Sequence, residues 1–283
     1  MSCYKVLRRI VPSAARLTYN PIFKIIVNSF DLLPRHMYEE FSNIPPNHMR
    51  IRVGVGVGIA KRMFANHVTY VTEAKDFWIH AFHSGLCRLD STIVDIGSGC
   101  GRYAQYLRDY RFLSERFTGN YIGIDIDEEM LNWCRRNFDS ERFAFYRSNH
   151  DSKAYKAAGN PDAYYVLPLA DEAADFVFST SLFTHLLEKE LVNYTRESYR
   201  VLKRDCFMAM FCFSMDHPPP TFGGRHTFRF RIGNAYVESM SVPDAAVAYE
   251  EKFLLEMALE ARFRTTEILT GPEDWQPMLL CRK

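Results

Sequence analysis

Three glycines alternate with other residues at Gly97, Gly99 and Gly101, directly after an apolar run and before a helical pattern. A chain that leaves a strand and turns at once into a helix favours residues without a Cβ atom, which also let a ligand approach the backbone. The free N–H groups at the start of the helix can then bind polar or negative groups of the ligand. The loop therefore predicts a cofactor site.

The glycine spacing and two acidic residues narrow the choice of cofactor. A dinucleotide fingerprint reads Gly-x-Gly-x-x-Gly, whereas here the third glycine comes one position earlier and Arg102 follows it, which disfavours NAD. Asp95 would repel a pyrophosphate, but it can pair with the amino group of a bound amino acid. Asp125, thirty residues later, can accept hydrogen bonds from ribose hydroxyls. S-adenosylmethionine (SAM) carries an amino-acid group, a ribose and a sulfonium charge, and it fits this set.

The pattern around these residues predicts an α/β fold in which strands and helices alternate. Such alternation is typical of a mainly parallel, doubly wound Rossmann-like sheet with helices on both faces. Asp127 is expected to cap the second helix of this core. The expected strands are residues 92–96, 120–125, 143–148, 174–179, 206–214, 265–269 and 278–282, and the expected helices are 102–111, 128–138 and 188–202.

Two further segments flank this core. Residues 1–90 are expected to form a mainly helical lid or substrate segment, with Thr72 and Glu73 capping a helix that ends near Gly85. The core of alternating strands and helices then spans residues 91–283, with a cap insertion at about 216–243, and Pro243 is expected to open a helix to Arg262. A second glycine run at 54–58 lacks an acid at a strand end and is interpreted as a turn.

The segments Val94–Arg102, Gly123–Asp125, Leu167–Asp171, Ala174–Ser179, Ser181–Leu186 and Glu197–Lys203 together resemble the class I SAM-dependent methyltransferases. The resemblance covers most of the chain from about Ile44 onward. It implies the seven-stranded class I fold, with a cap after the fifth strand, and SAM as cofactor, leaving S-adenosylhomocysteine as product. The cofactor residues then predicted are Asp95, Gly97, Ser98, Gly99, Gly101, Arg102, Asp125, Ile126, Asn149, His150 and Ser179.

The chain departs from the family pattern at two informative places. Arg204, Asp205 and Cys206 replace the usual Pro-Gly-Gly before the fifth strand, which changes a turn and leaves the chemistry alone. Asn149 replaces the usual aspartate of the third motif, and its amide oxygen can still accept a hydrogen bond from the adenine amino group.

Within the family, the chain looks most like a bacterial subgroup found with glycosyltransferase and polysaccharide genes. Tyr155 and Gly159 keep two positions of that subgroup's Tyr-Asn-Pro-x-Gly segment, and the stretch from Pro243 to Glu251 is also similar. The resemblance implies a methyl group transferred to an oxygen of a sugar or glycan. A small metabolite or natural product methylated on oxygen or nitrogen is the first alternative, and a non-catalytic module that binds a partner such as a glycosyltransferase is the second.

Three residues are candidates for acid–base catalysis. His185 lies just beyond the fourth expected strand, at the carboxyl edge where ligands of open α/β sheets bind. A histidine there can remove the proton of an acceptor hydroxyl near neutral pH, or it can simply shape the cofactor pocket. Asp216 and His217 follow the fifth strand at the same edge and form a second pair, unless they belong only to a loop.

The stretch from Arg225 to Arg231 alternates basic or polar residues with His226, Phe228 and Phe230. As a strand it would place Arg225 and Arg229 on one face, where a phosphate or carboxylate of the substrate could bind, with His226 nearby on the other face. The same arginines would equally suit a solvated edge strand that discourages aggregation.

The composition excludes several classes of protein. A net charge of +1 gives no general attraction for nucleic acid, and no long uncharged apolar run predicts a membrane span. No Asp/Asn cluster typical of metal-dependent enzymes stands at the strand ends, so no metal is predicted. The odd number of scattered cysteines, without a Cys-x-x-Cys pair, indicates neither a zinc site nor a disulfide framework and suits the cytoplasm. They are Cys3, Cys87, Cys100, Cys134, Cys206, Cys212 and Cys281.

The N-terminus is basic, with six Lys or Arg residues and one acid among residues 1–36. Pro12, Arg16 and Asn20 interrupt the apolar stretch that a signal peptide would need. Ile22, Phe23 and neighbouring apolar residues among these charges are compatible with a membrane-surface helix or a contact to a glycosyltransferase, and also with a helical lid packed on the core.

Overall fold

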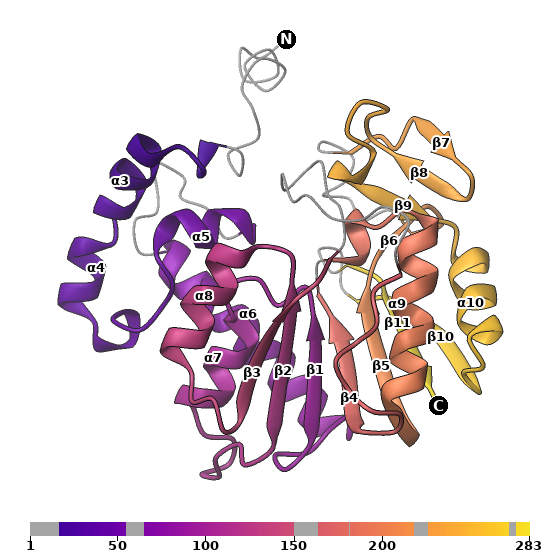
Figure 1. The fold of residues 1–283 in the computed structure, drawn as a ribbon, viewed down its shortest axis with the longest axis horizontal. Helices are drawn as coiled ribbons and strands as arrows, with labels where there is room; N and C mark the ends of the chain where they lie inside the picture. Colours follow the sequence, from indigo (N-terminus) through magenta and orange to yellow (C-terminus); the bar gives the residue numbers. More distant parts are fainter. Residues whose placement is uncertain (1–16, 55–64, 150–163, 181, 218–225, 272–275) are drawn as a thin grey trace.

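The computed structural model describes residues 17–54, 65–149, 164–180, 182–217, 226–271 and 276–283. A seven-stranded sheet in the order β10-β11-β5-β4-β1-β2-β3 crosses the molecule (Figure 1). Its strands are β1 (Thr92–Ile96), β2 (Asn120–Asp125), β3 (Phe143–Arg147), β4 (Ala174–Ser179), β5 (Leu202–Phe211), β10 (Thr265–Leu269) and β11 (Met278–Arg282). β11 runs antiparallel to both of its neighbours, and the remaining pairs are parallel. The predicted fold class is confirmed.

Helices cover both faces of this sheet, and the alternation of side chains along each strand explains why. Ile93 of β1 packs into the core under α6, α7 and α8, whereas Val94 points to the opposite core under α9 and α10. The helices are α6 (Ala65–His83), α7 (Arg102–Asp109), α8 (Glu128–Asn137), α9 (Glu188–Val201) and α10 (Glu251–Glu260). Asp127 caps α8 through its carboxylate, as predicted.

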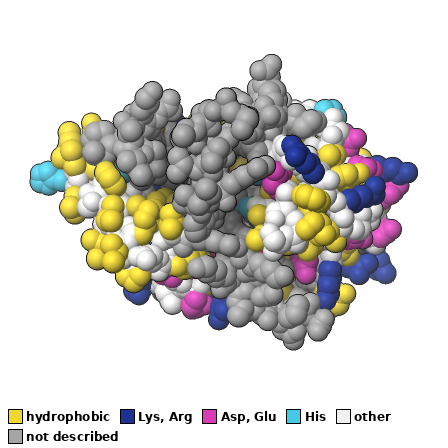
Figure 2. All heavy atoms as spheres, turned by 90° about the horizontal axis from the view of Figure 1, so that it is seen from above, with side chains coloured by type: hydrophobic (Ala, Val, Ile, Leu, Met, Phe, Trp, Pro, Cys, Tyr) yellow, Lys and Arg dark blue, Asp and Glu magenta, His cyan; other side chains and the backbone are white. Residues whose placement is uncertain are grey.

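The first described residues form helices alone: α3 (Pro21–Ser29), α4 (Leu32–Met37), η1 (Glu39–Phe41), α5 (Asn47–Arg52) and the long α6. α6 starts at Ala65, so Thr72 lies inside it and does not cap its start; the prediction there was wrong. Hydrophobic side chains gather on the left of the molecule, where α3 and α4 lie (Figure 2). No helix among the described residues is both long and apolar enough to cross a membrane.

A second, four-stranded sheet lies above the carboxyl edge of the large one, in the order β6-β9-β8-β7 (Figure 1). Its strands are β6 (Phe213–Ser214), β7 (Phe230–Ile232), β8 (Ala235–Val237) and β9 (Val247–Tyr249), and η4 (Pro243–Ala245) precedes β9. The chain enters it when β5 ends at Phe211 and the strand continues as β6, so the single strand predicted to Ser214 is divided between two sheets.

Two predictions for this region were wrong. The helix expected from Pro243 to Arg262 begins only at Glu251, because Val247–Tyr249 pairs with β6 and β8 instead. The alternating stretch from Arg225 to Arg231 was expected to be a strand, but among its described residues the strand begins only at Phe230. Before it, the backbone N–H groups of Thr227 and Phe228 donate to the Glu238 carboxylate, and Phe228 has a positive φ.

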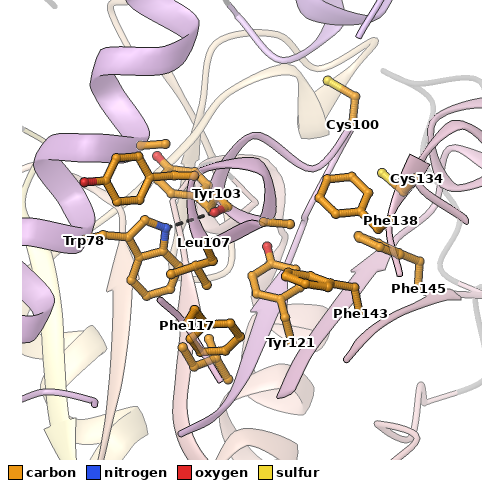
Figure 3. Packing of buried hydrophobic residues seen from close by; sticks show 14 of the residues in the cluster. Trp78, Cys100, Tyr103, Leu107, Phe117, Tyr121, Cys134, Phe138, Phe143 and Phe145 are labelled. Atoms are coloured by element: carbon orange, nitrogen blue, oxygen red, sulfur yellow. Dashed lines mark hydrogen bonds between the residues drawn. The ribbon is translucent and has the colours of Figure 1, made fainter. Parts of the chain in front are cut away.

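Aromatic side chains fill the core beneath the glycine loop (Figure 3). Trp78 of α6 is fully buried, and its indole N–H donates to the backbone oxygen of Tyr103 at 2.9 Å. Tyr121 and Phe143 pack against each other from neighbouring strands. These contacts join α6, α7 and the sheet into one rigid support for the loop that follows β1.

Candidate active site

A cavity of about 330 Å³ opens at the carboxyl edge of β1, β2 and β4, a size typical of small-molecule sites. The cavity is lined by the glycine loop, by the end of β2 and the start of α8, by α5, and by the segment after β4. The lining residues are Ile51, Arg52, Val53, Gly54, Gly97, Ser98, Gly99, Arg102, Tyr103, Asp125, Ile126, Asp127, Met130, Thr180, Leu182, His185 and Leu186.

The glycine loop is held in place by the neighbouring strand. The N–H groups of Gly97 and Ser98 both donate to the backbone oxygen of Ile124, at 2.7 and 3.0 Å. The N–H of Gly99 donates to the Asp125 carboxylate at 2.7 Å. Gly101 adopts φ 77° immediately before α7, a left-handed conformation that favours glycine. The loop therefore turns as the sequence predicts, and β2 fixes its position.

Asp125 lies where β2 ends, at the wall of the cavity. Its other carboxylate oxygen accepts from the N–H of Asp127 at 2.9 Å, which fixes the side chain. Burial raises the pKa of Asp125 to about 6, against the effect of the backbone hydrogen bonds from Asp127 and Gly99. A carboxylate so placed can still accept hydroxyl donors, because its two oxygens offer about four lone-pair sites.

Asp95 is fully buried at the end of β1 and does not line the cavity directly. The Tyr121 hydroxyl donates to one of its oxygens, while the other, Oδ1, has no hydrogen-bond partner among the described residues. Burial raises the pKa of Asp95 to about 7, opposed by the Tyr121 hydrogen bond. Buried polar atoms without partners are costly, so Oδ1 is suited to a donor that a bound molecule or water brings.

Two serines near Asp95 also have a buried oxygen without a hydrogen-bond partner among the described residues. The hydroxyls of Ser98 and Ser179 are buried and have no partner among the described residues. Ser98 lies in the glycine loop and lines the cavity, and Ser179 ends β4 beside it. Together with Asp95 Oδ1 they form a polar set that fits the amino-acid end of SAM, and the site therefore fits this cofactor.

His185 comes from η2 (Phe183–His185) and lines the cavity. Its Nδ1 lies 3.0 Å from the backbone oxygen of Asp244, which can only accept, so Nδ1 carries the proton. Burial lowers the pKa of His185, and the backbone hydrogen bonds to Asp244 and Ala245 oppose this effect. The ring is therefore neutral at pH 7, with its basic nitrogen at Nε2.

Asp216, His217 and Asn149, which were also predicted, do not line the cavity. Asp216 accepts the N–H of Glu251 at the start of α10, and His217 pairs with the Glu251 carboxylate at 2.6 Å while its side chain is 59% exposed. Both stand outside the cavity lining, in a helix-capping arrangement. Asn149 is exposed and lines a small separate depression with Tyr164 and Tyr165.

Arg229 and His226, which were predicted to bind substrate, do not line the cavity. Arg229 is exposed, and the ring of His226 stacks against Phe228 and contacts Phe213 within the cap. His150 and Arg225 lie outside the described residues. The described residues contain no group of three or more His, Cys, Asp or Glu side chains that could hold a metal ion.

Several cavity residues were missed by the sequence analysis, and Arg52, Val53 and Gly54 at the end of α5 are three of them. Arg52 is buried, and its guanidinium donates to Asp127 at 2.8 Å and to Glu129 at 2.7 Å. Val53 packs on the glycine loop, since a Cβ added to Gly99 would lie 2.6 Å from its Cγ1. Gly54, with φ 82°, belongs to the glycine run interpreted as an unrelated turn. No local pattern in residues 47–54 marks this role.

The fold is the one that class I methyltransferases share, with a single antiparallel strand inserted near one edge of a parallel sheet. Residues 94–210 match the methyltransferase domain family. A protein of Pyrococcus horikoshii has a similar fold, with 16% identity over 80% of this chain and 93% of its own and a TM-score of 0.52. The S-adenosylmethionine-dependent methyltransferase SibL matches at 13% identity, over 83% of this chain and 62% of its own, with a TM-score of 0.50.

The matched region includes the glycine loop, Asp125 and His185, and it ends inside β5. These findings and the polar set at Asp95 support a SAM-dependent methyltransferase domain over residues 94–210. SAM is its cofactor.

Proposed function

We propose that the enzyme transfers the methyl group of SAM to a hydroxyl oxygen of a sugar or glycan, with His185 as general base. The observation that carries this proposal is the state of His185 at the cavity wall. Its Nδ1 proton is held by the Asp244 backbone oxygen, and burial keeps the ring neutral. A neutral imidazole of fixed tautomer is ready to accept a proton at Nε2.

A hydroxyl acceptor needs such a base. When bound, SAM supplies an electrophilic methyl group on a positively charged sulfur. As the hydroxyl oxygen forms its bond to the methyl carbon and the carbon–sulfur bond breaks, His185 Nε2 takes the hydroxyl proton. The products are the methyl ether, S-adenosylhomocysteine and an imidazolium that the Asp244 backbone oxygen can stabilise. General-base catalysis of this kind contributes about 10²–10⁴-fold to a rate.

The choice of a sugar rests on the resemblance to the polysaccharide-associated subgroup and on the cap beside the cavity. Exposed or partly exposed polar side chains cover this cap. Tyr236 donates to the Glu250 carboxylate, and Arg231 lies over the Tyr236 ring. Carboxylates and arginines beside an aromatic ring are groups that recognise the hydroxyls of a sugar.

A second candidate is a small metabolite or natural product, and the cavity lining favours it. Ile51, Val53, Met130, Leu182 and Leu186 give the cavity an apolar wall. An apolar cavity with a few polar groups is typical of sites that enclose small molecules.

The test is a methyl-transfer assay with SAM carrying a labelled methyl group. One acceptor panel holds nucleotide sugars and oligosaccharides, and the other holds small phenols, carboxylates and amines. We expect a methyl ether on a sugar, located by mass spectrometry and NMR. The turnover of His185→Ala should fall by roughly 10²–10⁴-fold. His217→Ala, an exposed histidine outside the cavity, is the matched control and should retain activity.

Methylation of the second panel alone would replace the sugar by a small acceptor. Methylation of an amine that His185→Ala leaves unchanged would refute the general base as well, because a neutral amine already carries the attacking lone pair.

A further inference from the structure

Helices α3 and α4 present large apolar side chains to solvent. On α3 these are Ile22, Ile25 and Ile26, which are 69%, 72% and 53% exposed and recur with the i, i+3, i+4 spacing of one helix face. On α4 they continue as Leu32, 71% exposed, and Leu33, 50% exposed. We call these five side chains the α3–α4 face. Hydrophobic side chains gather on the left of Figure 2, the side on which α3 and α4 lie.

The opposite side of α3 is fixed to the rest of the protein. Val27 is buried, and its backbone oxygen accepts from the Asn47 side chain at 2.7 Å. Lys24 pairs with Glu129 at the start of α8, at 2.6 Å. The Asn20 side chain caps the helix through the N–H groups of Ile22 and Phe23. The α3–α4 face is thus the outward side of an anchored helix, and an apolar patch held in this way marks an interaction surface.

The charges that precede this face in the sequence favour one kind of partner. No acidic residue precedes Asp31 in the chain, whereas Lys5, Arg8, Arg9 and Arg16 precede α3. Asp31 itself is buried and pairs with Arg50. An apolar helix face that follows a basic segment suits the boundary between the acyl chains and the headgroups of an anionic bilayer.

A second copy of the chain fits this face less well. A two-fold contact through α3 would join two copies of a chain whose sequence before α3 is basic, and like charges repel. The exposed acids nearest in sequence, Glu39 and Glu40, come after α4 and mark the far limit of the apolar run. α3 has nine residues and α4 six, so they can lie on a membrane and cannot cross it.

We infer that the α3–α4 face docks the enzyme on the surface of an anionic membrane, with Ile22, Ile25 and Ile26 inserted at the headgroup boundary. This inference does not depend on the identity of the methyl acceptor. Because α5, which lines the cofactor cavity, follows α4 in the same helical segment, docking would hold the cavity close to the membrane.

The experiment is co-flotation of the full chain with lipid vesicles. One set contains phosphatidylcholine alone, and the other contains phosphatidylcholine mixed with phosphatidylglycerol. We expect binding to the anionic vesicles, weakened by salt, and little binding to the neutral ones. Ile25→Glu combined with Ile26→Glu should lower the bound fraction by roughly tenfold or more, because neither side chain can then be buried in the apolar part of the bilayer.

The matched control is Leu259→Glu on α10, which also replaces an exposed apolar side chain, 53% exposed, and should leave flotation unchanged. SAM affinity and thermal stability show that each variant remains folded. Failure of the wild-type chain to float with anionic vesicles would overturn the inference. Equal binding to both vesicle types, or unchanged binding of the double variant, would overturn it too. The inference would also be overturned if the wild-type chain formed a dimer and did not float, while the double variant was a monomer, since the face would then pair two copies.

Discussion

Replacing Arg52 by methionine tests whether α5 is locked onto the cofactor site. The Arg52 guanidinium is fully buried and donates to Asp127, to Glu129 and, through Nε at 2.8 Å, to the hydroxyl of Thr18. It also lies 4.0 Å from the centre of the Tyr19 ring. Three segments far apart in the sequence, residues 18–19, residue 52 and residues 127–129, therefore meet at one side chain.

The magnitude follows from burial. Removing one partner of a buried ion pair leaves an uncompensated charge, here chiefly that of Asp127, whose side chain is 6% exposed. Such a loss costs about 3–5 kcal/mol of unfolding free energy. Glu129 adds less, because its side chain is 36% exposed and solvent screens it. We expect Arg52→Met to lie within this range, and its SAM affinity to fall because Asp127 orients Asp125.

The assay is urea unfolding at pH 7 without cofactor, together with calorimetry of SAM binding. Arg204→Met is the matched control. The Arg204 side chain is 80% exposed, and its Nε lies as far as 3.8 Å from the Glu172 carboxylate. Its replacement should change the free energy of unfolding by less than about 0.5 kcal/mol. The contacts with Lys24, Arg52 and His48 lower the pKa of Glu129 to about 2, although burial opposes them. The contribution of Glu129 to the free energy of unfolding is present above the ordinary glutamate pKa and is lost as pH falls toward 2. The difference in unfolding free energy between wild type and Arg52→Met should therefore narrow in that pH range. A loss below about 1 kcal/mol at pH 7, with normal SAM affinity, would refute the reasoning.

Three other predictions concern the cofactor site and the general base. Gly99→Val should abolish SAM binding in a folded protein, because Gly99 has φ 53° and an added Cβ would meet Val53 at 2.6 Å; unchanged affinity by calorimetry would contradict this. SAM affinity should rise with pH up to about 7 and then level off. The pKa values of Asp95 and Asp125 are raised to about 7 and about 6, and a cationic ligand favours their ionised forms, so binding below these values releases protons. Equal heats of binding in buffers of different ionisation enthalpy near pH 6 would count against it. His185→Ala should lower turnover while SAM affinity stays nearly constant, and the wild-type rate should fall only below the usual histidine range, because burial lowers the pKa of His185; a parallel loss of affinity would mean that the residue only shapes the pocket.

Much of the core was predictable because its determinants are local. The bounds of β1, β2, β4, β10 and β11 agree with the sequence prediction, since each is a short apolar or alternating run between clear breaks. Asp127 was predictable as a helix cap for the same reason, because a cap depends on the few residues that follow it. The glycine loop and Asp125 were placed at one edge because parallel strands share their carboxyl end.

The predictions that failed depended on distant partners. Val247–Tyr249 reads as part of a helix, but β6 and β8 offer it strand neighbours. The sequence pattern makes Thr227 and Phe228 part of an alternating strand, but their N–H groups donate to the Glu238 carboxylate instead of to a neighbouring strand. Local propensity is a weak preference, and tertiary contacts override it.

The sequence by itself determined the cofactor-binding loop, because the turn, the helix start and the two acids are each specified within a few residues. Only the tertiary structure brought α5 to that loop. Arg52 and Val53 have no local signature. They reach the cavity because a buried cation needs partners, which Thr18, Asp127 and Glu129 provide from two other parts of the chain. Likewise, His185 acquires its defined tautomer only because the cap places the Asp244 backbone oxygen beside its Nδ1.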